Sequence, residues 1–239
     1  MNVAEFASVT ADPGLGEPIL DNPAWASLTG PHIGFSERLG GAARYLPEVA
    51  PFVAVADHRD PQHWLDAAEL VGPGGTFAIA GSGVTPPSGW PVEIIEGVQL
   101  VDVDLVKEAE PAAMRLTAAD VPEILDLVAR TQPGPFRPRT IELGTYLGIR
   151  RNGQLIAMAG ERLHPAGWTE ISAVCTDPAF RGQGLATRLV SAVAAGIADR
   201  GERVLLHAAA RNVTAIRLYL SIGFRLRRLT TFHSVTVSD

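Results

Sequence analysis

The stretch Asp177-Pro-Ala-Phe-Arg-Gly-Gln-Gly-Leu-Ala-Thr187 lies between a strand-like run and a long helical pattern. In the run Glu170 to Thr176, β-branched and small residues alternate, and after the stretch apolar residues recur at helical spacing. Gly182 and Gly184 permit a tight turn with inward N–H groups, and the positive end of a helix dipole favours an anion there. Arg181 adds a fixed positive charge. The stretch therefore predicts a strand, a phosphate-binding loop and a helix, as in an α/β protein.

This loop matches neither of the two commoner phosphate-binding motifs. A Walker loop needs a Lys-Ser or Lys-Thr pair after its last glycine, whereas Leu185 and Ala186 follow Gly184. The dinucleotide fingerprint needs three glycines at its own spacing, and only Gly182 and Gly184 are present. The pattern that fits is Arg-x-x-Gly-x-Ala, formed by Arg181, Gly184 and Ala186. Alone, so short a glycine turn is also compatible with a plain connection between strand and helix.

A second ordered block follows the helical pattern. Arg203 to Ala209 reads as a buried strand, and Asn212-Val-Thr-Ala-Ile-Arg-Leu-Tyr-Leu-Ser-Ile-Gly-Phe224 comes next. Asn212 is a favourable helix N-cap, and Gly223 supplies the left-handed residue that ends a helix. The residues between them that form one helical stripe are Ala215, Leu218, Tyr219 and Ile222. The block therefore predicts a second strand followed by a short helix.

Together the two blocks resemble the signature of the GNAT superfamily of N-acetyltransferases. Its pyrophosphate motif, Arg/Gln-x-x-Gly-x-Gly/Ala, is matched from Arg181 to Ala186, and its second motif, Asn-x-x-Ala-x-x-Leu-Tyr-x-x-x-Gly-Phe, from Asn212 to Phe224. The resemblance implies a GNAT fold, in which helices flank a mixed central sheet, and acetyl-coenzyme A (acetyl-CoA) as cosubstrate. The residues that it places at the coenzyme are Val174, Cys175, Thr176, Arg181, Gly182, Gln183, Gly184, Leu185, Ala186, Thr187, Asn212 and Ala215.

Direct acyl transfer requires a neutral amine, a stabilised oxyanion and a proton for the leaving thiolate. The resemblance makes Tyr219 the candidate acid; a core aromatic with a satisfied hydroxyl is the alternative. Backbone groups of Val174 to Thr176 would bind the pantetheine arm and polarise the carbonyl. Glu170 is the candidate base, directly or through water, because strand alternation would place it on one face with Ser172, Val174 and Thr176. A solvated carboxylate at the strand end is the alternative for Glu170.

Other reactive side chains have competing interpretations. Cys175 is a possible nucleophile, but a single cysteine among apolar neighbours favours a place in the core. His58 and His63 match no metal site, and no His-Glu-x-x-His sequence occurs, so we expect no metal. His207 is either an acceptor-site residue or a hydrogen-bonded structural histidine.

Two arginines fall in the loop Gln132-Pro-Gly-Pro-Phe-Arg-Pro-Arg139, whose prolines and glycine exclude regular structure. In GNAT folds the corresponding loop borders the acceptor site. Arg137 and Arg139 are therefore candidates for holding an acceptor carboxylate, with solvated loop arginines as the alternative.

Composition sets outer bounds on the protein. The chain has 239 residues, of which 46% are hydrophobic and 19% charged, which suits a globular protein with one large or two small cores. A net charge of -6 without a basic cluster argues against nucleic-acid binding. One cysteine fits a reducing compartment, and we expect no export signal and no membrane span. A cytoplasmic location is the resulting expectation.

The chain divides near Glu108-Ala-Glu-Pro-Ala112. Downstream, residues 113–239 read as a complete catalytic domain. It opens with a strand from Ala113 and a helix that begins at an Asp120–Glu123 capping box with Pro122 in its first turn, and it includes a hairpin at Asn152-Gly153. The last strand-like run covers residues 226–237.

Upstream, residues 1–110 alternate helix-like and strand-like segments but contain neither motif. The helix-like segments are 23–28 and 61–70, and the strand-like segments are 52–56, 77–80 and 92–103; the glycine-rich 72–75 and 81–83 read as turns. This layout resembles the FR47-like branch of GNAT proteins, related to glycine N-acyltransferases, in which a degenerate N-terminal GNAT-like domain precedes the active one. Residues 22–32 and 170–178 carry that resemblance.

The sequence thus predicts an N-acetyltransferase that moves an acetyl group from acetyl-CoA to a primary amine of a small molecule or peptide. One alternative is an amino-acid N-acyltransferase with a longer acyl donor. Another is a non-catalytic coenzyme A-binding regulator, against which an intact Tyr219 and the loop Arg181 to Ala186 argue. The motifs specify neither the acceptor nor the oligomeric state.

Overall fold

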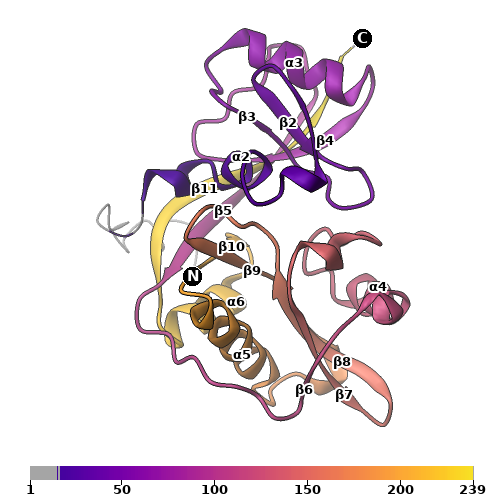
Figure 1. The fold of residues 1–239 in the computed structure, drawn as a ribbon, viewed down its shortest axis with the longest axis vertical. Helices are drawn as coiled ribbons and strands as arrows, with labels where there is room; N and C mark the ends of the chain where they lie inside the picture. Colours follow the sequence, from indigo (N-terminus) through magenta and orange to yellow (C-terminus); the bar gives the residue numbers. More distant parts are fainter. Residues whose placement is uncertain (1–14, 16, 239) are drawn as a thin grey trace.

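The computed structural model describes residue 15 and residues 17–238, which form a mixed α/β fold around a large sheet (Figure 1). The order of its eight strands is β4-β11-β5-β10-β9-β8-β7-β6, and only the β9–β10 pair is parallel. In that order the strands are Thr76–Ala80, Phe224–Thr236, Val92–Asp102, Arg203–Ala209, Trp168–Thr176, Gln154–Glu161, Tyr146–Arg151 and Ala113–Arg115. The predicted mixed central sheet flanked by helices is confirmed.

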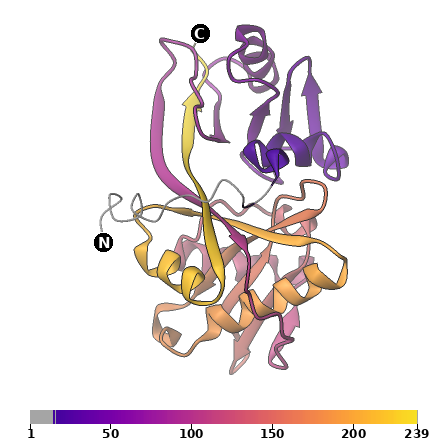
Figure 2. The same ribbon diagram turned by 90° about the vertical axis from the view of Figure 1, so that its left-hand side faces the viewer.

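Helices cover the two faces of this sheet. The helices α5 (Leu185–Asp199) and α6 (Val213–Ser221) pack on one apolar cluster with β5, β8, β9, β10 and β11 (Figure 2). The helix α4 (Val121–Thr131) packs on the other face, over β7, β8 and β9. Both predicted motif helices therefore lie on the same side of the sheet.

Local sequence signals explain several of the connections. Asn152 and Gly153 both have positive φ, as the predicted tight hairpin between β7 and β8 requires. The predicted capping box is wrong in its partners, because Thr117 and Asp120 form it one turn earlier, around a 3₁₀ turn that precedes α4. The N-cap residue of α4 itself, Asp120, makes no side-chain cap hydrogen bond to α4. The 3₁₀ turns in the described residues are Pro18–Asp21, Ile33–Phe35, Ala118–Asp120, Thr140–Leu143 and Pro178–Phe180.

The N-terminal half contributes a second, three-stranded antiparallel sheet. Its elements are α2 (Pro23–Leu28), β1 (Ser36–Leu39), β2 (Ala42–Tyr45), β3 (Val53–Val55) and α3 (Pro61–Val71). The helix α3 packs on β2 and β3 and on the far ends of β4 and β11. The strands β1 and β2 are too short and too mixed in polarity for their pattern to be recognised in the sequence.

The two halves of the chain share the large sheet. The strand β5 precedes the linker at 108–112, yet it pairs along its length with β11 and inserts between β11 and β10. The strand β11, yellow in Figure 1, continues toward the top of the picture and pairs with β4. The division into 1–110 and 113–239 therefore marks an exposed connection from β5 to β6, and strand pairing crosses it.

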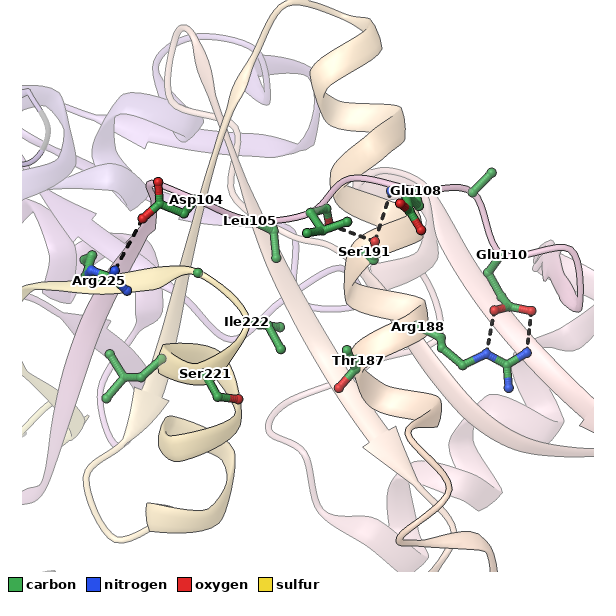
Figure 3. A pocket seen from close by; sticks show the side chains of 14 residues that line it. Asp104, Leu105, Glu108, Glu110, Thr187, Arg188, Ser191, Ser221, Ile222 and Arg225 are labelled. Atoms are coloured by element: carbon green, nitrogen blue, oxygen red, sulfur yellow. Dashed lines mark hydrogen bonds and ion pairs between the residues drawn. The ribbon is translucent and has the colours of Figure 1, made fainter.

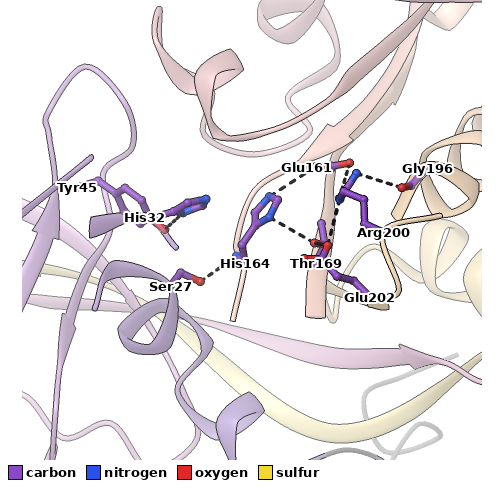
Figure 4. A network of polar contacts seen from close by, with 9 residues as sticks. All are labelled: Ser27, His32, Tyr45, Glu161, His164, Thr169, Gly196, Arg200 and Glu202. Atoms are coloured by element: carbon purple, nitrogen blue, oxygen red, sulfur yellow. Dashed lines mark hydrogen bonds and ion pairs between the residues drawn. The ribbon is translucent and has the colours of Figure 1, made fainter. Parts of the chain in front are cut away.

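A buried polar cluster joins the N-terminal half to the segment after β8 in the C-terminal half (Figure 4). His32 Nδ1 lies 2.8 Å from the Tyr45 hydroxyl, and the His32 and His164 rings are 4.8 Å apart. The backbone N–H of His164 donates to Ser27 Oγ in α2. Burial lowers the pKa of His32 to about 4, and the neighbouring His164 acts in the same direction.

This cluster predicts acid sensitivity of the fold. Between about pH 6.5 and 4, His32 is protonated in the unfolded chain but neutral in the folded chain. The free energy of unfolding therefore falls as the pH is lowered through this range. We expect the thermal midpoint of the wild type to fall more steeply than that of His32→Gln between pH 7 and 4.5. Parallel melting curves of both proteins measure this, and identical slopes would contradict it.

Candidate functional site

The sheet opens where the parallel pairing of β9 and β10 ends. Residues 168–171 of β9 pair with residues 203–206 of β10, after which β10 continues to pair only with β5. On its other side β9 still pairs with β8, through a bulge at which Ala173 adopts φ 53°. The backbone of 172–176 therefore presents unpaired groups toward β10.

The bulge changes which side chains share a face. Ile171 and Val174 both pack toward the α5 cluster, whereas Ala173 and Cys175 belong to the α4 cluster. Glu170, next to Ile171, lies on the face away from α5. The prediction that simple alternation puts Glu170 and Val174 on one face is therefore wrong, because the extra residue inverts the alternation.

The predicted phosphate loop is an exposed turn with available donors. Gly182 and Gly184 have φ of 78° and 70°, which glycine adopts without strain, and Gly184 is the N-cap of α5. The first helical bond is from Arg188 N–H to the Gly184 carbonyl. Across the part of the chain that the structure describes, the N–H groups of 182–187 have no acceptor. Successive free donors at a helix N-terminus suit an anion.

The second motif places a tyrosine near this opening. Asn212 Oδ1 accepts from Ala215 N–H and caps α6, as predicted. Tyr219 is buried, and its hydroxyl has no hydrogen-bond partner among the described residues. Burial raises the pKa of Tyr219 to about 12, and Cys175 on β9 acts in the same direction. The phenol therefore keeps its proton at neutral pH.

A cavity of about 630 Å³ lies between α5, α6 and the linker after β5 (Figure 3). Thr187 and Ser191 line it from α5, and Leu220 and Ile222 from the end of α6. The linker closes one side through a two-pronged ion pair of Glu110 with Arg188 and a hydrogen bond from Glu108 N–H to Ser191 Oγ. Through Thr187 the cavity is adjacent to the phosphate loop.

Glu170 is a buried, fully engaged carboxylate. It is 0% exposed, and Arg162 donates to both of its oxygens, at 2.8 and 2.6 Å. His207 Nδ1 lies 2.7 Å from Oε1. Burial opposes ionisation, but the Arg162 guanidinium outweighs it and holds the pKa of Glu170 well below its usual range. The alternative of a solvated carboxylate is excluded, and a direct base role conflicts with this geometry because such a carboxylate binds a proton weakly.

His207 belongs to a chain of hydrogen bonds that begins at Glu170. Its Nε2 lies 3.0 Å from Gln99 Nε2, while Gln99 Oε1 accepts from Arg227 at 2.7 Å. That arrangement makes Gln99 the donor to His207 and leaves Nδ1–H to donate to Glu170. Arg162, Gln99 and His207 border a small cavity of about 20 Å³, enough for one water molecule.

The remaining predicted residues have structural surroundings. Cys175 is buried and its pKa is raised to about 11 by burial, which disfavours a thiolate nucleophile. Arg139 pairs with Glu48 and Glu142, and Arg137 donates to the Pro47 carbonyl. These contacts tie the loop to the N-terminal half and engage both arginines. No group of potential metal ligands occurs among the described residues.

Arg162 and Gln99 were not singled out in the sequence. The available signal was that Glu161 and Arg162 directly follow the apolar run 155–160 after the hairpin turn, since buried charges require partners. The partners themselves, Glu170 and His207, come from other strands. Only the folded sheet reveals these pairs.

Comparisons with known proteins agree with this architecture. The family described as FR47-like protein matches residues 146–233. N-alpha-acetyltransferase RimI of Mycobacterium tuberculosis is 32% identical over 133 residues, 51% of this chain and 83% of the relative. A crystal structure of a putative GNAT-family acetyltransferase from Novosphingobium aromaticivorans superposes with a TM-score of 0.85 and 38% identity, covering 93% of this chain and all of that one.

A GCN5-related N-acetyltransferase from Kribbella flavida shares the fold, with a TM-score of 0.56 and 18% identity over 91% of this chain and 96% of that one. The parallel strands that separate, and the glycine loop that begins α5, place the chain in the α/β class of folds. The chain belongs to the GNAT superfamily of N-acetyltransferases and is a transferase. Among the described residues, no helix is long and apolar enough to cross a membrane.

The buried ion pair generates a stability prediction. Glu170→Gln leaves the Arg162 guanidinium without its countercharge, so we expect the free energy of unfolding to fall by about 3–5 kcal/mol. Urea denaturation measures the change. Glu48→Gln, at an exposed arginine pair, is the control and should have a much smaller effect. Equal effects of both variants would contradict the assigned role of the buried pair.

Proposed function

We propose that this protein transfers an acetyl group from acetyl-CoA to a primary amine of a small molecule or peptide. The observation that carries the proposal is the row of free N–H groups at 182–187 beside the opening between β9 and β10. A pyrophosphate needs such donors, and a pantetheine arm needs unpaired strand edges of this kind. Membership of the GNAT superfamily supports the same donor.

In this proposal the coenzyme lies along the α5–α6 side of the sheet. Arg181 and the N–H groups of 182–187 bind the pyrophosphate, the backbone of 174–176 binds the pantetheine arm, and Asn212 and Ala215 border it from α6. The neighbouring cavity of about 630 Å³ provides room at the start of α5. Its carboxylates, such as Glu110, are unsuited to further phosphate groups.

Residues on the two faces of the large sheet would have different roles in the reaction. An amine on the face away from α5 attacks the thioester carbonyl, and a backbone N–H at the β9 bulge stabilises the oxyanion. Tyr219 protonates the leaving thiolate from the other side. Because both oxygens of Glu170 and both ring nitrogens of His207 are engaged, we assign Glu170 an indirect role as base, with a water in the small cavity receiving the proton.

The proposed class of acceptor is inferred from the name of a relative. RimI of Mycobacterium tuberculosis is named an N-alpha-acetyltransferase, which favours the α-amine of a peptide as the first acceptor to test. The surroundings of Arg137 and Arg139 give no support to a dedicated carboxylate site, and so weaken the amino-acid N-acyltransferase alternative. We also propose a cytoplasmic location, on the basis of the single cysteine.

The direct test is thiol release from acetyl-CoA over a panel of peptides with free N-termini, amino acids, polyamines and aminoglycosides. Coenzyme binding is titrated in parallel. Turnover with one class of amine supports the proposal and names the acceptor. Binding without turnover with acetyl-CoA or longer acyl donors supports the regulator instead.

Gly184 tests the phosphate loop. Gly184→Asp places a negative charge beside the free N–H groups, whereas Gly184→Asn has the same shape, tolerates positive φ and is neutral. We expect the aspartate variant to lose at least tenfold in affinity for acetyl-CoA relative to the asparagine variant, an effect of about 1.4 kcal/mol. Calorimetric titration of both measures it. Equal affinities of the two variants for acetyl-CoA would contradict the assignment of pyrophosphate binding to this loop.

Tyr219 tests the assignment of the acid. Tyr219→Phe removes the donated proton and keeps the ring that packs on Phe224, so turnover should fall about 10²-fold while acetyl-CoA affinity stays near the wild-type value. Steady-state kinetics with the best acceptor of the panel and a coenzyme titration provide the two numbers. Undiminished turnover would return Tyr219 to a purely structural role.

A further inference from the structure

Tyr146 on β7 is a buried tyrosine with no bonding partner for its hydroxyl. The residue is 1% exposed, and its Oη is inaccessible and makes no hydrogen bond within the described chain. Its ring is held firmly, edge to face with Phe136 at 5.4 Å. A phenylalanine would pack equally well and avoid the cost of a desolvated hydroxyl. The hydroxyl therefore indicates a partner that the folded chain does not itself supply.

The ring extends from β7 across β8 toward β9. Tyr146 pairs with Gly160 on β8, and a side chain built at Gly160 would lie 2.1–2.5 Å from atoms of the Tyr146 ring. Gly160 in turn pairs with Ser172, the residue before the bulge at Ala173. The glycine thus gives the ring a path over β8, toward the place where β9 leaves β10.

The charged residues of the site share this face. Arg162 and Glu170 are close enough to act on the pKa of Tyr146, which burial raises above its usual range; Arg162 opposes that rise and Glu170 adds to it. This is the face away from α5 and α6, on which the proposed acceptor would approach. A neutral phenol beside a carboxylate offers an oxygen that accepts a hydrogen bond from an amine.

We propose that the Tyr146 hydroxyl binds the acceptor's primary amine and orients its nitrogen toward the thioester carbonyl. The inference rests on the proposed N-acetyltransferase function. Tyr146 takes no proton, because the buried phenol does not ionise at neutral pH. It fixes one N–H of the amine, so that the nitrogen lone pair points at the opening between β9 and β10.

The test is Tyr146→Phe, with acetyl-CoA and a short peptide with a free N-terminal α-amine, or the best acceptor of the panel, as probes. We expect an unchanged or higher thermal midpoint, unchanged acetyl-CoA affinity, and kcat/KM for the amine lower by at least tenfold with a raised amine KM. Wild-type kcat/KM in the variant overturns the inference. So does a failure to fold, because an unpartnered hydroxyl is dispensable for folding.

Tyr45→Phe is the matched control. The Tyr45 hydroxyl is bonded to His32, so its loss should lower the thermal midpoint, whereas the loss of the unpartnered Tyr146 hydroxyl should not. The two variants are thus expected to have opposite effects on the thermal midpoint, and a lowered midpoint in both would overturn the inference. Absence of turnover in the wild type with every amine would instead contradict the proposed function, which separates the two failures.

Discussion

The end of parallel pairing between β9 and β10, after Ile171 and Leu206, is the constraint on which the rest of the structure depends. Strand backbones that separate must find other partners or leave groups free for a ligand. Here β8 holds β9 and β5 holds β10, so both strands stay ordered while a gap opens between them. The left-handed Ala173 carries the local cost, which is of the order of 1–3 kcal/mol for a residue held in so unusual a conformation.

The ion pair of Arg162 and Glu170 lies just below this gap and explains the polarity of the site. Glu170 is fully buried, and a buried carboxylate without a bound cation would be protonated. Because Arg162 donates to both oxygens of Glu170, the carboxylate stays ionised. Hydrogen bonds through His207 and Gln99 then connect it to the N-terminal segment. A carboxylate that binds protons so weakly disfavours direct proton abstraction by Glu170.

Short-range signals made much of the fold predictable. The loop at 181–186, the N-cap Asn212, the hairpin at Asn152-Gly153 and the terminal strand depend on neighbouring residues, and the structure has each element where it was expected. Long-range consequences were not predictable. No glycine in the sequence indicates the bulge at Ala173. Because of this bulge, Glu170 and Val174 lie on opposite faces of the sheet and not on the same face as expected. Glu48, which pairs with Arg139, is distant in sequence, and Glu170, which pairs with Arg162, lies on the next strand, so no spacing rule identifies these pairs.

The insertion of β5 into the large sheet makes the N-terminal half part of the catalytic architecture. The strand β10 needs a neighbour on the side away from β9, and β5, from the other side of the linker, supplies it. Gln99 of β5 then reaches His207 of β10, and α2 and the Tyr45 cluster cover the same face. Without β5, the strand that diverges from β9 would have no partner beyond Leu206, and the gap would lose one of its two walls. The motif-free half of the chain therefore maintains the opening that the motif-bearing half is proposed to use.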